Sequence, residues 1–206
     1  MPEFEPRMHT GQLYRCNSPE LFQKQMELRD LIHQYNQTLP SNAEAHQALM
    51  TQIFAKVGEN CFFEPPFFAN WGRFTHLGNN VYANFNLTLV DDTHIYIGDN
   101  TMIGPNVTIC TAAHPIHPEL RRQAAQYNKP VTIGKNVWIG AGSTLLPGVT
   151  IGENTVIGAG SLVTHDIPAN VVAYGSPCRV IRPIDPEDLT GYDHGKPLDF
   201  PAQDNL

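Results

Sequence analysis

This 206-residue sequence has few of the features that mark nucleic-acid-binding or membrane proteins. It has 13 Lys and Arg against 20 Asp and Glu, a net charge of −7, and no basic run that could follow a phosphate backbone. No apolar stretch approaches the roughly 20 residues that span a bilayer, and the acidic start at Glu3 is unlike a signal peptide. We therefore expect no nucleic-acid partner, no membrane association and a cytoplasmic location.

Cysteine is also scarce. The four cysteines lack a CxxC pair or any paired spacing, so we expect reduced thiols rather than a disulfide framework or a zinc site. They are Cys16, Cys61, Cys110 and Cys178. In contrast, the 16 Gly and 17 Pro exceed average usage and disfavour a mostly helical protein. The length suffices for one domain with a full core.

An N-terminal helical segment is predicted over residues 1–58. Ser18 is a candidate cap and Pro19 suits the first helical position of an amphipathic helix over residues 19–37.

A second helix is predicted immediately afterwards. Residues 41–44 form a capping-box pattern that begins with Ser41, and the apolar periodicity then continues through Val57 to a stop at Gly58. One face of each helix is apolar, so we expect both to pack against a larger body.

A six-residue repeat organises the chain beyond these helices. Aliphatic residues recur every six positions, often followed by Gly, and the position four after each is small or β-branched, which suits a second inward site. The aliphatic positions are Ile133, Ile139, Leu145, Ile151, Ile157 and Val163, preceded by Ile97, Ile103 and Ile109 and by a weaker run of Leu77, Ala83, Leu89 and Ile95. The register slips by two residues between Ile95 and Ile97.

A period of six fits neither an α-helix, with 3.6 residues per turn, nor simple strand alternation. It is typical of short strands joined by tight corners, with three strands per coil and aliphatic columns about 4.8 Å apart. The columns pair Ile133 with Ile151, Ile139 with Ile157 and Leu145 with Val163. Corners are expected at Asp99-Asn100, Lys135-Asn136 and Glu153-Asn154, where positive φ is needed. The prediction is a triangular parallel β-helix.

The repeat is interrupted once. Residues 111–130 lack the aliphatic-glycine register, which predicts a loop extruded from the coil stack, and insertions of this length are usually functional or disordered. The β-helix domain is expected over residues 59–182. Residues 183–206 form a C-terminal extension, whose Pro, Gly and Asp content predicts little structure from residue 185 onward.

Several motifs join the repeat to a known family. They are Asn84-Phe85-Asn86, Val90-Asp91-Asp92, the His-Pro segment from Ala113 to Glu119, the segment from Val137 to Gly140 and the segment from Gly175 to Ile181. Together, over residues 8–182, they resemble the maltose and galactoside O-acetyltransferases. The resemblance implies a mainly β protein, a left-handed parallel β-helix of hexapeptide repeats after the N-terminal helical segment. It also implies a homotrimer with acetyl-CoA in grooves between subunits. No metal is expected, because the histidines lack a convincing ligand spacing.

His114 is the candidate catalytic residue. Transfer of an acetyl group to a sugar hydroxyl needs a base, and imidazole suits that task. The position of His114 at the start of the interrupting segment matches the catalytic residue of the family, and His117 is expected to be secondary. Cys110 could suggest a covalent acyl-enzyme, but its place in a repeat favours packing.

Four residues are predicted to contact the sugar or polyol acceptor. Tyr82, Asn84 and Asp92 precede the His segment by about one coil, so they could line one cleft, and the resemblance adds Asn70. The family also uses an aspartate and an arginine near the first helix. The corresponding positions here are Cys16 and Gln25, which points to a different acceptor.

The resemblance also implies a cofactor site. Arg179 and Arg182 form a cationic pair at the end of the coils and are candidates for the coenzyme A phosphates. By carry-over from the family, contacts along the pantetheine arm would come from Ala141, Ala159, Thr164 and His165.

Two alternatives remain beside an acetyl-CoA-dependent sugar O-acetyltransferase. One is a hexapeptide metalloenzyme like the gamma-class carbonic anhydrases, and the other is a non-catalytic β-helix scaffold. Against the first, His76, His94, His114 and His117 lack the one-coil spacing that ligands converging on one ion would need. Against the second stands the intact His-Pro segment.

Overall fold

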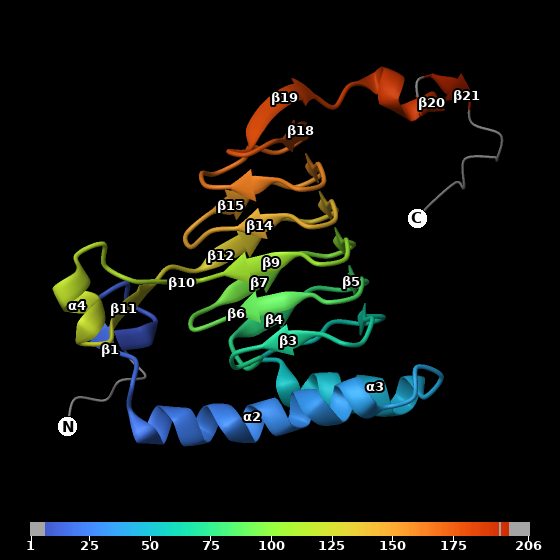
Figure 1. The fold of residues 1–206 in the computed structure, drawn as a ribbon. Helices are drawn as coiled ribbons and strands as arrows, with labels where there is room; N and C mark the ends of the chain where they lie inside the picture. The colour runs from blue at the N-terminus through green and yellow to red at the C-terminus, as the bar shows by residue number, and fades with distance from the viewer. Residues whose placement is uncertain (1–6, 194, 198–206) are drawn as a thin grey trace.

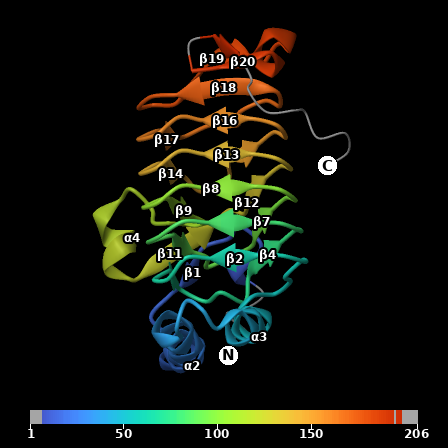
Figure 2. The ribbon, with the colours of Figure 1, turned by 90° about the vertical axis from the view of Figure 1, so that its right-hand side faces the viewer.

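The structure, a computed structural model, describes residues 7–193 and 195–197. The chain winds into a stack of parallel coils, which confirms the predicted β-helix (Figure 1). Two helices, α2 (Pro19–Gln37) and α3 (Ala43–Ile53), lie side by side beneath the first coil (Figure 2). Their apolar faces therefore close one open end of the core.

Three parallel sheets form the faces of the prism, and each regular coil contributes one short strand to each. The first sheet contains β4 (Thr75–Leu77), β7 (Ile95–Ile97), β12 (Val131–Ile133) and β15 (Thr150–Ile151). The second contains β2 (Phe62–Phe63), β5 (Tyr82–Ala83), β8 (Met102–Ile103), β13 (Trp138–Ile139), β16 (Val156–Ile157) and β18 (Val171–Tyr174), with β19 (Arg179–Pro183) antiparallel at its end. The third contains β3 (Phe68–Ala69), β6 (Thr88–Val90), β9 (Thr108–Cys110), β14 (Thr144–Leu145) and β17 (Leu162–Val163).

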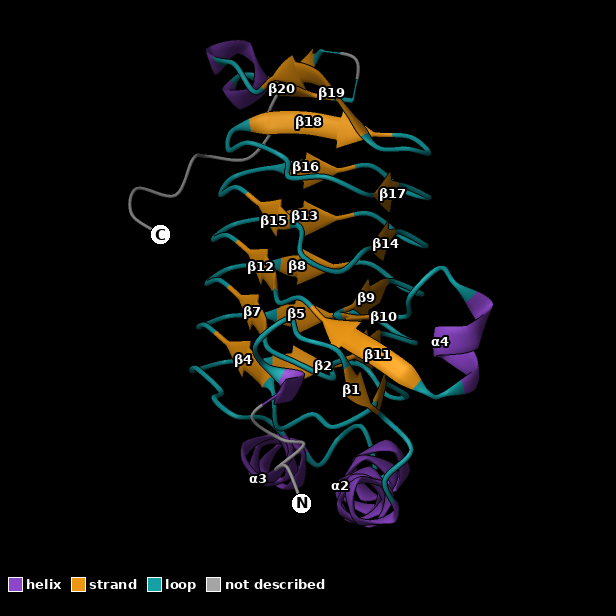
Figure 3. Cartoon of the chain, turned by 90° about the vertical axis from the view of Figure 1, so that its left-hand side faces the viewer, coloured by secondary structure: helices purple, strands orange, loops and turns teal. Residues whose placement is uncertain are grey.

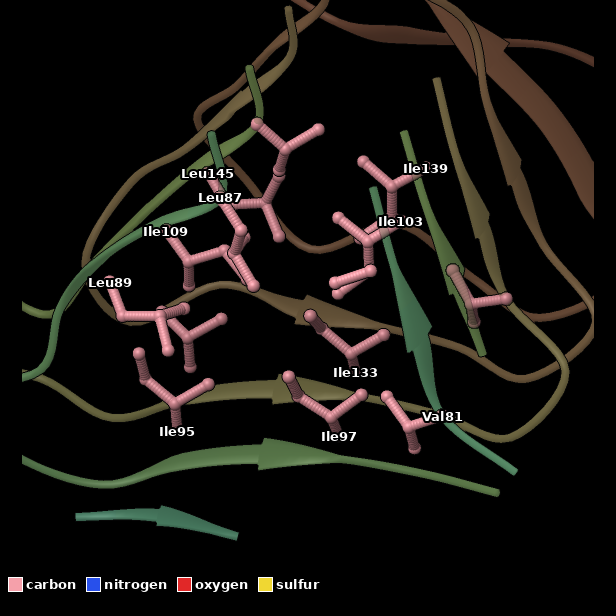
Figure 4. Packing of buried hydrophobic residues seen from close by; sticks show 14 of the residues in the cluster. Val81, Leu87, Leu89, Ile95, Ile97, Ile103, Ile109, Ile133, Ile139 and Leu145 are labelled. Atoms are coloured by element: carbon pink, nitrogen blue, oxygen red, sulfur yellow. The ribbon is translucent and has the colours of Figure 1, made fainter. Parts of the chain in front are cut away.

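The aliphatic columns follow the register that the repeat predicts. The confirmed pairs are Ile133 with Ile151, Ile139 with Ile157 and Leu145 with Val163. All six side chains are at most 2% exposed, and Figure 4 shows three of them, Ile133, Ile139 and Leu145, pointing into the prism. Burying one such side chain stabilises the fold by about 1.5–3 kcal/mol.

The second inward position of each repeat is also confirmed. Its five predicted residues are buried, namely Val137, Ser143, Val149, Thr155 and Ser161. The hydroxyls of Ser143 and Thr155 donate to carbonyls of the neighbouring coil, as Thr155 Oγ1 does to Pro168 O at 2.8 Å. A buried polar group with a partner costs little, so small polar residues are tolerated inside this narrow core.

The two-residue slip lies at a corner and not, as predicted, between Ile95 and Ile97. Both isoleucines point inward from β7 and pair with two inward residues of β4. The extra residues precede β7, because Leu89 and Ile97 are eight positions apart instead of six. The chain therefore has a longer corner at residues 91–94.

Asparagines turn the regular corners. Asn100, Asn136 and Asn154 have φ values of 57°, 53° and 58°, which confirms the predicted corner positions. Their side chains also link the coils, since Asn136 Nδ2 donates to Asn154 Oδ1 at 3.1 Å. An amide ladder thus runs along one edge of the prism.

Helix α2 has the bounds that the sequence predicts, but its cap differs. Ser18 occupies the N-cap position without a side-chain capping hydrogen bond, and Pro19 fills the first turn. Docking of α2 on α3 and the first coil replaces the missing cap as the source of stability.

Helix α3 is shorter than predicted and begins one residue later. Its N-cap is Asn42 rather than Ser41, and the Asn42 side chain accepts from Ala45 N at 3.1 Å. It ends at Ile53 instead of continuing to Val57. The reason is that the chain joins the first coil there, where Ala55 N donates to Thr75 O at 3.0 Å and Lys56 forms a parallel bridge with His76.

The interruption after β9 leaves the coil stack but is folded. It contains β10 (Ala112–Ala113), helix α4 (Pro118–Arg122) and β11 (Ala125–Asn128). Strand β11 pairs antiparallel with β10 and with the N-terminal strand β1 (Tyr14–Arg15), and Figure 3 shows it crossing the outside of the stack. These pairings give regular structure to a segment whose lack of repeat register predicts a loop.

The C-terminal extension is also more ordered than predicted, as far as it is described. A 3-10 helix, η1 (Pro186–Leu189), is capped by Asp185, and strands β20 (Gly191–Tyr192) and β21 (Lys196–Pro197) form a short antiparallel pair. The rest of the predicted extension, residues 194 and 198–206, lies outside the described residues. Within the described chain, no helix combines the length and the apolar character needed to cross a bilayer.

Candidate functional site

The three irregular corners of the β-helix lie at the same edge, between the third sheet and the first. They follow β3, β6 and β9, and they consist of residues 70–74, residues 91–94 and the folded insertion. Because successive coils stack directly on one another, irregular corners at the same edge of the prism lie next to each other. The sequence thus concentrates its non-repetitive side chains at one place.

These corners, β1 and α2 enclose a pocket of about 230 Å3, here called the Asp92 pocket. Its polar lining comes from Tyr14, Gln25, Arg29, Asn70, Asp92 and Gln126. Cys16 lines it too, and Leu21, Phe22 and Trp71 supply apolar walls. A small pocket with a few convergent polar groups between apolar walls suits a compact polyhydroxylated ligand.

A hydrogen-bond chain fixes the Asp92 carboxylate. Asn70 Nδ2 donates to Asp92 Oδ2 at 2.8 Å, and Trp71 Nε1 donates to Asp92 Oδ1 at 3.4 Å. Arg29 Nη2 in turn donates to Asn70 Oδ1 at 3.0 Å, which orients that amide. The pocket therefore presents a carboxylate of defined direction, able to accept a hydrogen bond from a ligand hydroxyl.

Asp91 lies directly behind this carboxylate and is fully buried. Its oxygens accept from Trp71 N at 2.8 Å and from the Thr75 hydroxyl at 3.3 Å. Burial raises the pKa of Asp91 to about 7, opposed by the Trp71 hydrogen bond and reinforced by the neighbouring charge of Asp92. Asp91 thus ties the corner after β3 to the corner after β6, at an electrostatic cost near neutral pH.

This cost predicts a pH dependence of stability. The pKa of Asp91 is about 7 in the folded state against 3.8 for a free side chain, so the folded state binds the proton more tightly. The free energy of unfolding should then decrease as pH rises from about 4 to about 7. Asp91→Asn keeps an acceptor for Trp71 N but cannot ionise, so its stability relative to wild type should increase by about 2–3 kcal/mol between pH 5 and pH 8. Urea unfolding at pH 5 and at pH 8 measures this difference. An equal change in the free energy of unfolding between the two pH values for both proteins would contradict the prediction.

His114 follows β10 at the edge of the insertion. Its Nδ1 lies 2.9 Å from Ala125 O, a carbonyl that can only accept, so Nδ1 carries the proton and the Nε2 lone pair is free. Ala125 adjoins Gln126 of the Asp92 pocket, although His114 itself does not line that pocket. The His117 ring accepts from Glu119 N at 3.3 Å and caps α4, which gives it a structural role.

A second hollow of about 470 Å3 runs along the outer face of the second sheet. This Trp138 groove is lined mainly by apolar residues, and it contains four predicted site residues. They are Tyr82, Asn84, Ala141 and Ala159. An elongated apolar groove beside exposed main chain suits a flexible, largely uncharged ligand arm.

The expectation that Tyr82, Asn84 and Asp92 line one cleft is wrong within a single chain. Tyr82 projects from β5 on the second sheet, whereas Asp92 follows β6 on the third. A triangular coil turns these positions to different sides of the prism, and proximity along the sequence conceals this. The four acceptor candidates form two separate pairs: Asn70 hydrogen-bonds Asp92, whereas Tyr82 and Asn84 line the Trp138 groove.

The remaining cofactor candidates lie near the C-terminal end of the stack. Thr164 and His165 follow β17 and hydrogen-bond each other at 2.8 Å. Arg179 and Arg182 both lie on β19, but their surroundings differ. Arg182 makes two 2.7 Å hydrogen bonds to Asp188, whereas Arg179 Nη1 donates to Cys178 O. The two arginines of the predicted cationic pair therefore differ in their hydrogen-bond partners.

Sequence reasoning missed several lining residues of the Asp92 pocket. Arg29 lies one helical turn beyond Gln25 on α2, so helical spacing could have revealed it. Tyr14 and Gln126 are brought together only by the pairing of β1 with β11, which carries no motif. For Cys110, burial raises the thiol pKa, which disfavours the thiolate that an acyl-enzyme would need.

The histidine spacing also needs correction. His76 and His94 are 18 positions apart, which is one regular coil, and His76 Nε2 lies 3.0 Å from His94 Nδ1. Over the residues that the structure covers, no group of three or more His, Cys, Asp or Glu side chains could hold a metal ion. The pair is thus a hydrogen-bonded contact between β4 and the corner at residues 91–94.

Comparisons with known proteins bear on this geometry. The family described as the maltose acetyltransferase hexapeptide capping motif matches residues 7–58, and the bacterial transferase hexapeptide family, with six repeats, matches residues 130–165. The galactoside O-acetyltransferase of Lactococcus lactis is 54% identical over 97% of this chain and 98% of its own, and that of Escherichia coli is 50% identical over 93% and 94%.

Solved structures agree. A galactoside acetyltransferase in complex with coenzyme A superposes with a TM-score of 0.92 at 47% identity, covering 97% of this chain and all of its own. A maltose O-acetyltransferase from Clostridium difficile gives 0.86 at 42% identity, covering 88% and 97%. These matches confirm the predicted left-handed β-helix and favour the acetyltransferase prediction over the carbonic anhydrase-like and scaffold alternatives. The chain belongs to the maltose and galactoside O-acetyltransferase family of hexapeptide-repeat acyltransferases.

Proposed function

We propose that this protein transfers the acetyl group of acetyl-CoA to a hydroxyl of a sugar, with His114 as the general base. The observation that carries the proposal is the hydrogen bond from His114 Nδ1 to Ala125 O, which leaves Nε2 free to accept a proton. A backbone carbonyl in strand β11 here orients the imidazole, as a carboxylate does in other catalytic histidines.

The reaction then proceeds in one bound complex. His114 Nε2 removes the proton of the acceptor hydroxyl as its oxygen attacks the thioester carbonyl carbon. The carbon–sulfur bond breaks when the tetrahedral intermediate collapses, and the proton held by His114 passes to the departing coenzyme A sulfur. Catalysis by a positioned base contributes about 10² to 10⁴ in rate.

Each of the two hollows is assigned to one substrate. The Asp92 pocket, with Asn70 and Asp92, holds the sugar acceptor. The Trp138 groove holds the pantetheine arm along Ala141 and Ala159, with Thr164 and His165 further along the stack. Relatives named for galactoside and maltose acetylation support a sugar acceptor, and the solved structure in complex with coenzyme A supports coenzyme A binding.

A homotrimer would bring the Trp138 groove of one subunit close to the Asp92 pocket of the next. In one chain, Tyr82 and Asn84 face the Trp138 groove, away from Asp92. If the groove of one subunit faces the His114 segment of the next, these residues and the thioester approach the acceptor from the neighbouring chain. The exposed Trp138, 52% accessible, and Met102, 51% accessible, are the apolar surface that such an interface would cover.

The phosphates of coenzyme A are assigned mainly to Arg179. Arg182 would first have to leave Asp188, whose two hydrogen bonds hold it at the C-terminal extension.

The cytoplasmic location stays a prediction from the sequence.

Release of free thiol from acetyl-CoA in the presence of candidate acceptors tests the proposed function. We expect thiol release that depends on an added sugar, with galactosides and maltose as the first acceptors to try. Free coenzyme A, measured with a thiol reagent, and the acetylated sugar, measured by mass spectrometry, should form in equal amounts. Thiol release with no dependence on any sugar would refute the acceptor class.

A further inference from the structure

A buried polar network forms one wall of the Asp92 pocket. It joins Tyr14, Gln126 and Asn128, which are 5%, 5% and 1% exposed. Gln126 Nε2 lies 2.6 Å from the Tyr14 hydroxyl and 3.0 Å from Asn128 Oδ1. Asn128 Nδ2 lies 3.0 Å from Met8 O, from Asp92 O and from the Tyr14 hydroxyl.

Two backbone carbonyls determine the direction of every hydrogen bond in this network. Met8 O and Asp92 O can only accept, so the Asn128 amide must direct Nδ2 toward them and Oδ1 away. Asn128 Oδ1 then needs a donor, which fixes Gln126 with Nε2 facing it. The same Nε2 also faces Tyr14, so the Tyr14 oxygen accepts a hydrogen bond and does not donate one to Gln126.

The hydroxyl proton of Tyr14 therefore has no acceptor within this network. Among the described residues none accepts it, and the amide nitrogen of Asn128 has no lone pair to offer. Burial raises the pKa of Tyr14, with a further contribution from the negative charge of Asp92, so the hydroxyl keeps its proton at all physiological pH values. A buried donor without a partner costs stability, which suggests that a ligand supplies the missing acceptor.

We infer that Tyr14 is a specificity-determining residue that donates its hydroxyl proton to an oxygen of the sugar acceptor in the Asp92 pocket. This inference rests on the proposed function and deepens it. Tyr14 and Asp92 both line the pocket, so they present a donor and an acceptor to one polyol. A site built to donate a buried hydrogen bond selects strongly for a ligand that has the matching oxygen.

The test compares wild type with Tyr14→Phe, using acetyl-CoA with methyl β-galactoside and its monodeoxy analogues. We expect kcat/KM for the parent galactoside to fall about 10-fold, with the KM for acetyl-CoA unchanged. For one monodeoxy analogue, the one that lacks the oxygen facing Tyr14, wild type should already be poor and Tyr14→Phe should cause no further loss. This pattern isolates the hydrogen bond from any general disturbance.

Tyr35→Phe is the matched control, because Tyr35 is equally buried and donates to Phe63 O at 2.6 Å, away from the pocket. It should lower Tm without changing acceptor selectivity. Gln126→Glu is a second variant, since a carboxyl oxygen in place of Nε2 accepts the Tyr14 proton while the hydroxyl stays. It should reproduce the loss for the parent galactoside even if Tyr14→Phe does not fold.

The outcomes separate this inference from the proposed function. If wild type is active and both Tyr14→Phe and Gln126→Glu match it with every acceptor, the role of Tyr14 is overturned and the acetyltransferase assignment stands. An equal loss against all analogues would also overturn it, because it would indicate a structural role. If wild type acetylates no sugar at all, the proposed function itself fails.

Discussion

His114→Ala should reduce kcat for sugar acetylation by about 10²-fold to 10⁴-fold, the usual contribution of a general base. The KM for acetyl-CoA should change little, because His114 lies on the insertion and not in the Trp138 groove. A loss in kcat and in kcat/KM together is the signature of an interaction made in the transition state. Steady-state thiol release with a saturating acceptor measures both constants.

His117→Ala provides the matched control. His117 lies three residues further along the same insertion, and its ring caps the short helix α4. Its removal should cost about 1 kcal/mol of local stability, as for other caps, and leave most of kcat in place. Wild-type turnover in His114→Ala, or an equal loss in both variants, would require another base.

The core could be predicted from the sequence because the period of the aliphatic residues alone determines it. Each inward Ile sits above the next, so Ile139 and Ile157 pair as the spacing of 18 requires. Asn136 and Asn154 fix the corners for the equally local reason that positive φ is cheap there. The end of α3 could not be predicted in this way, because the apolar periodicity through Val57 continues into the first coil, where tertiary hydrogen bonds replace helical ones.

The site was less predictable because it forms where the repeat fails. Asn70 and Asp92 belong to stacked corners, so their contact follows from the coil geometry once the slip is placed correctly. Tyr14 and Gln126 meet across 112 positions through the pairing of β1 with β11, and no local pattern indicates that pairing. The separation of Asn84 from Asp92 follows from the six-residue period, because successive strands of a coil lie on different faces, but their proximity along the sequence concealed it.

That separation leads to the second large effect, a complementation between two inactive variants. If each site takes His114 from one subunit and Asn84 from its neighbour, then His114→Ala and Asn84→Ala damage every site in their own homotrimers. Co-refolding the two variants in equal amounts creates mixed trimers. A site is intact when the chain supplying His114 carries the Asn84 substitution and the chain supplying Asn84 carries the His114 substitution. With random assembly, about one site in four meets this condition.

Activity should therefore rise from about 1% or less in the His114→Ala homotrimer to about a quarter of wild type in the mixture. The matched control is a mixture of His114→Ala with Asp92→Ala. Asp92 and the His114 segment both lie at the corner edge of one chain, so both variants damage the same half of the site. That half is intact only in a chain carrying neither substitution, and such chains are absent from the mixture, so activity should stay low. If the first mixture also stays inactive, Asn84 acts within the chain that supplies His114, and the shared-site proposal would have to be replaced by one in which each subunit closes its own groove. Rescue in the control would mean instead that Asp92 and His114 reach one site from different chains.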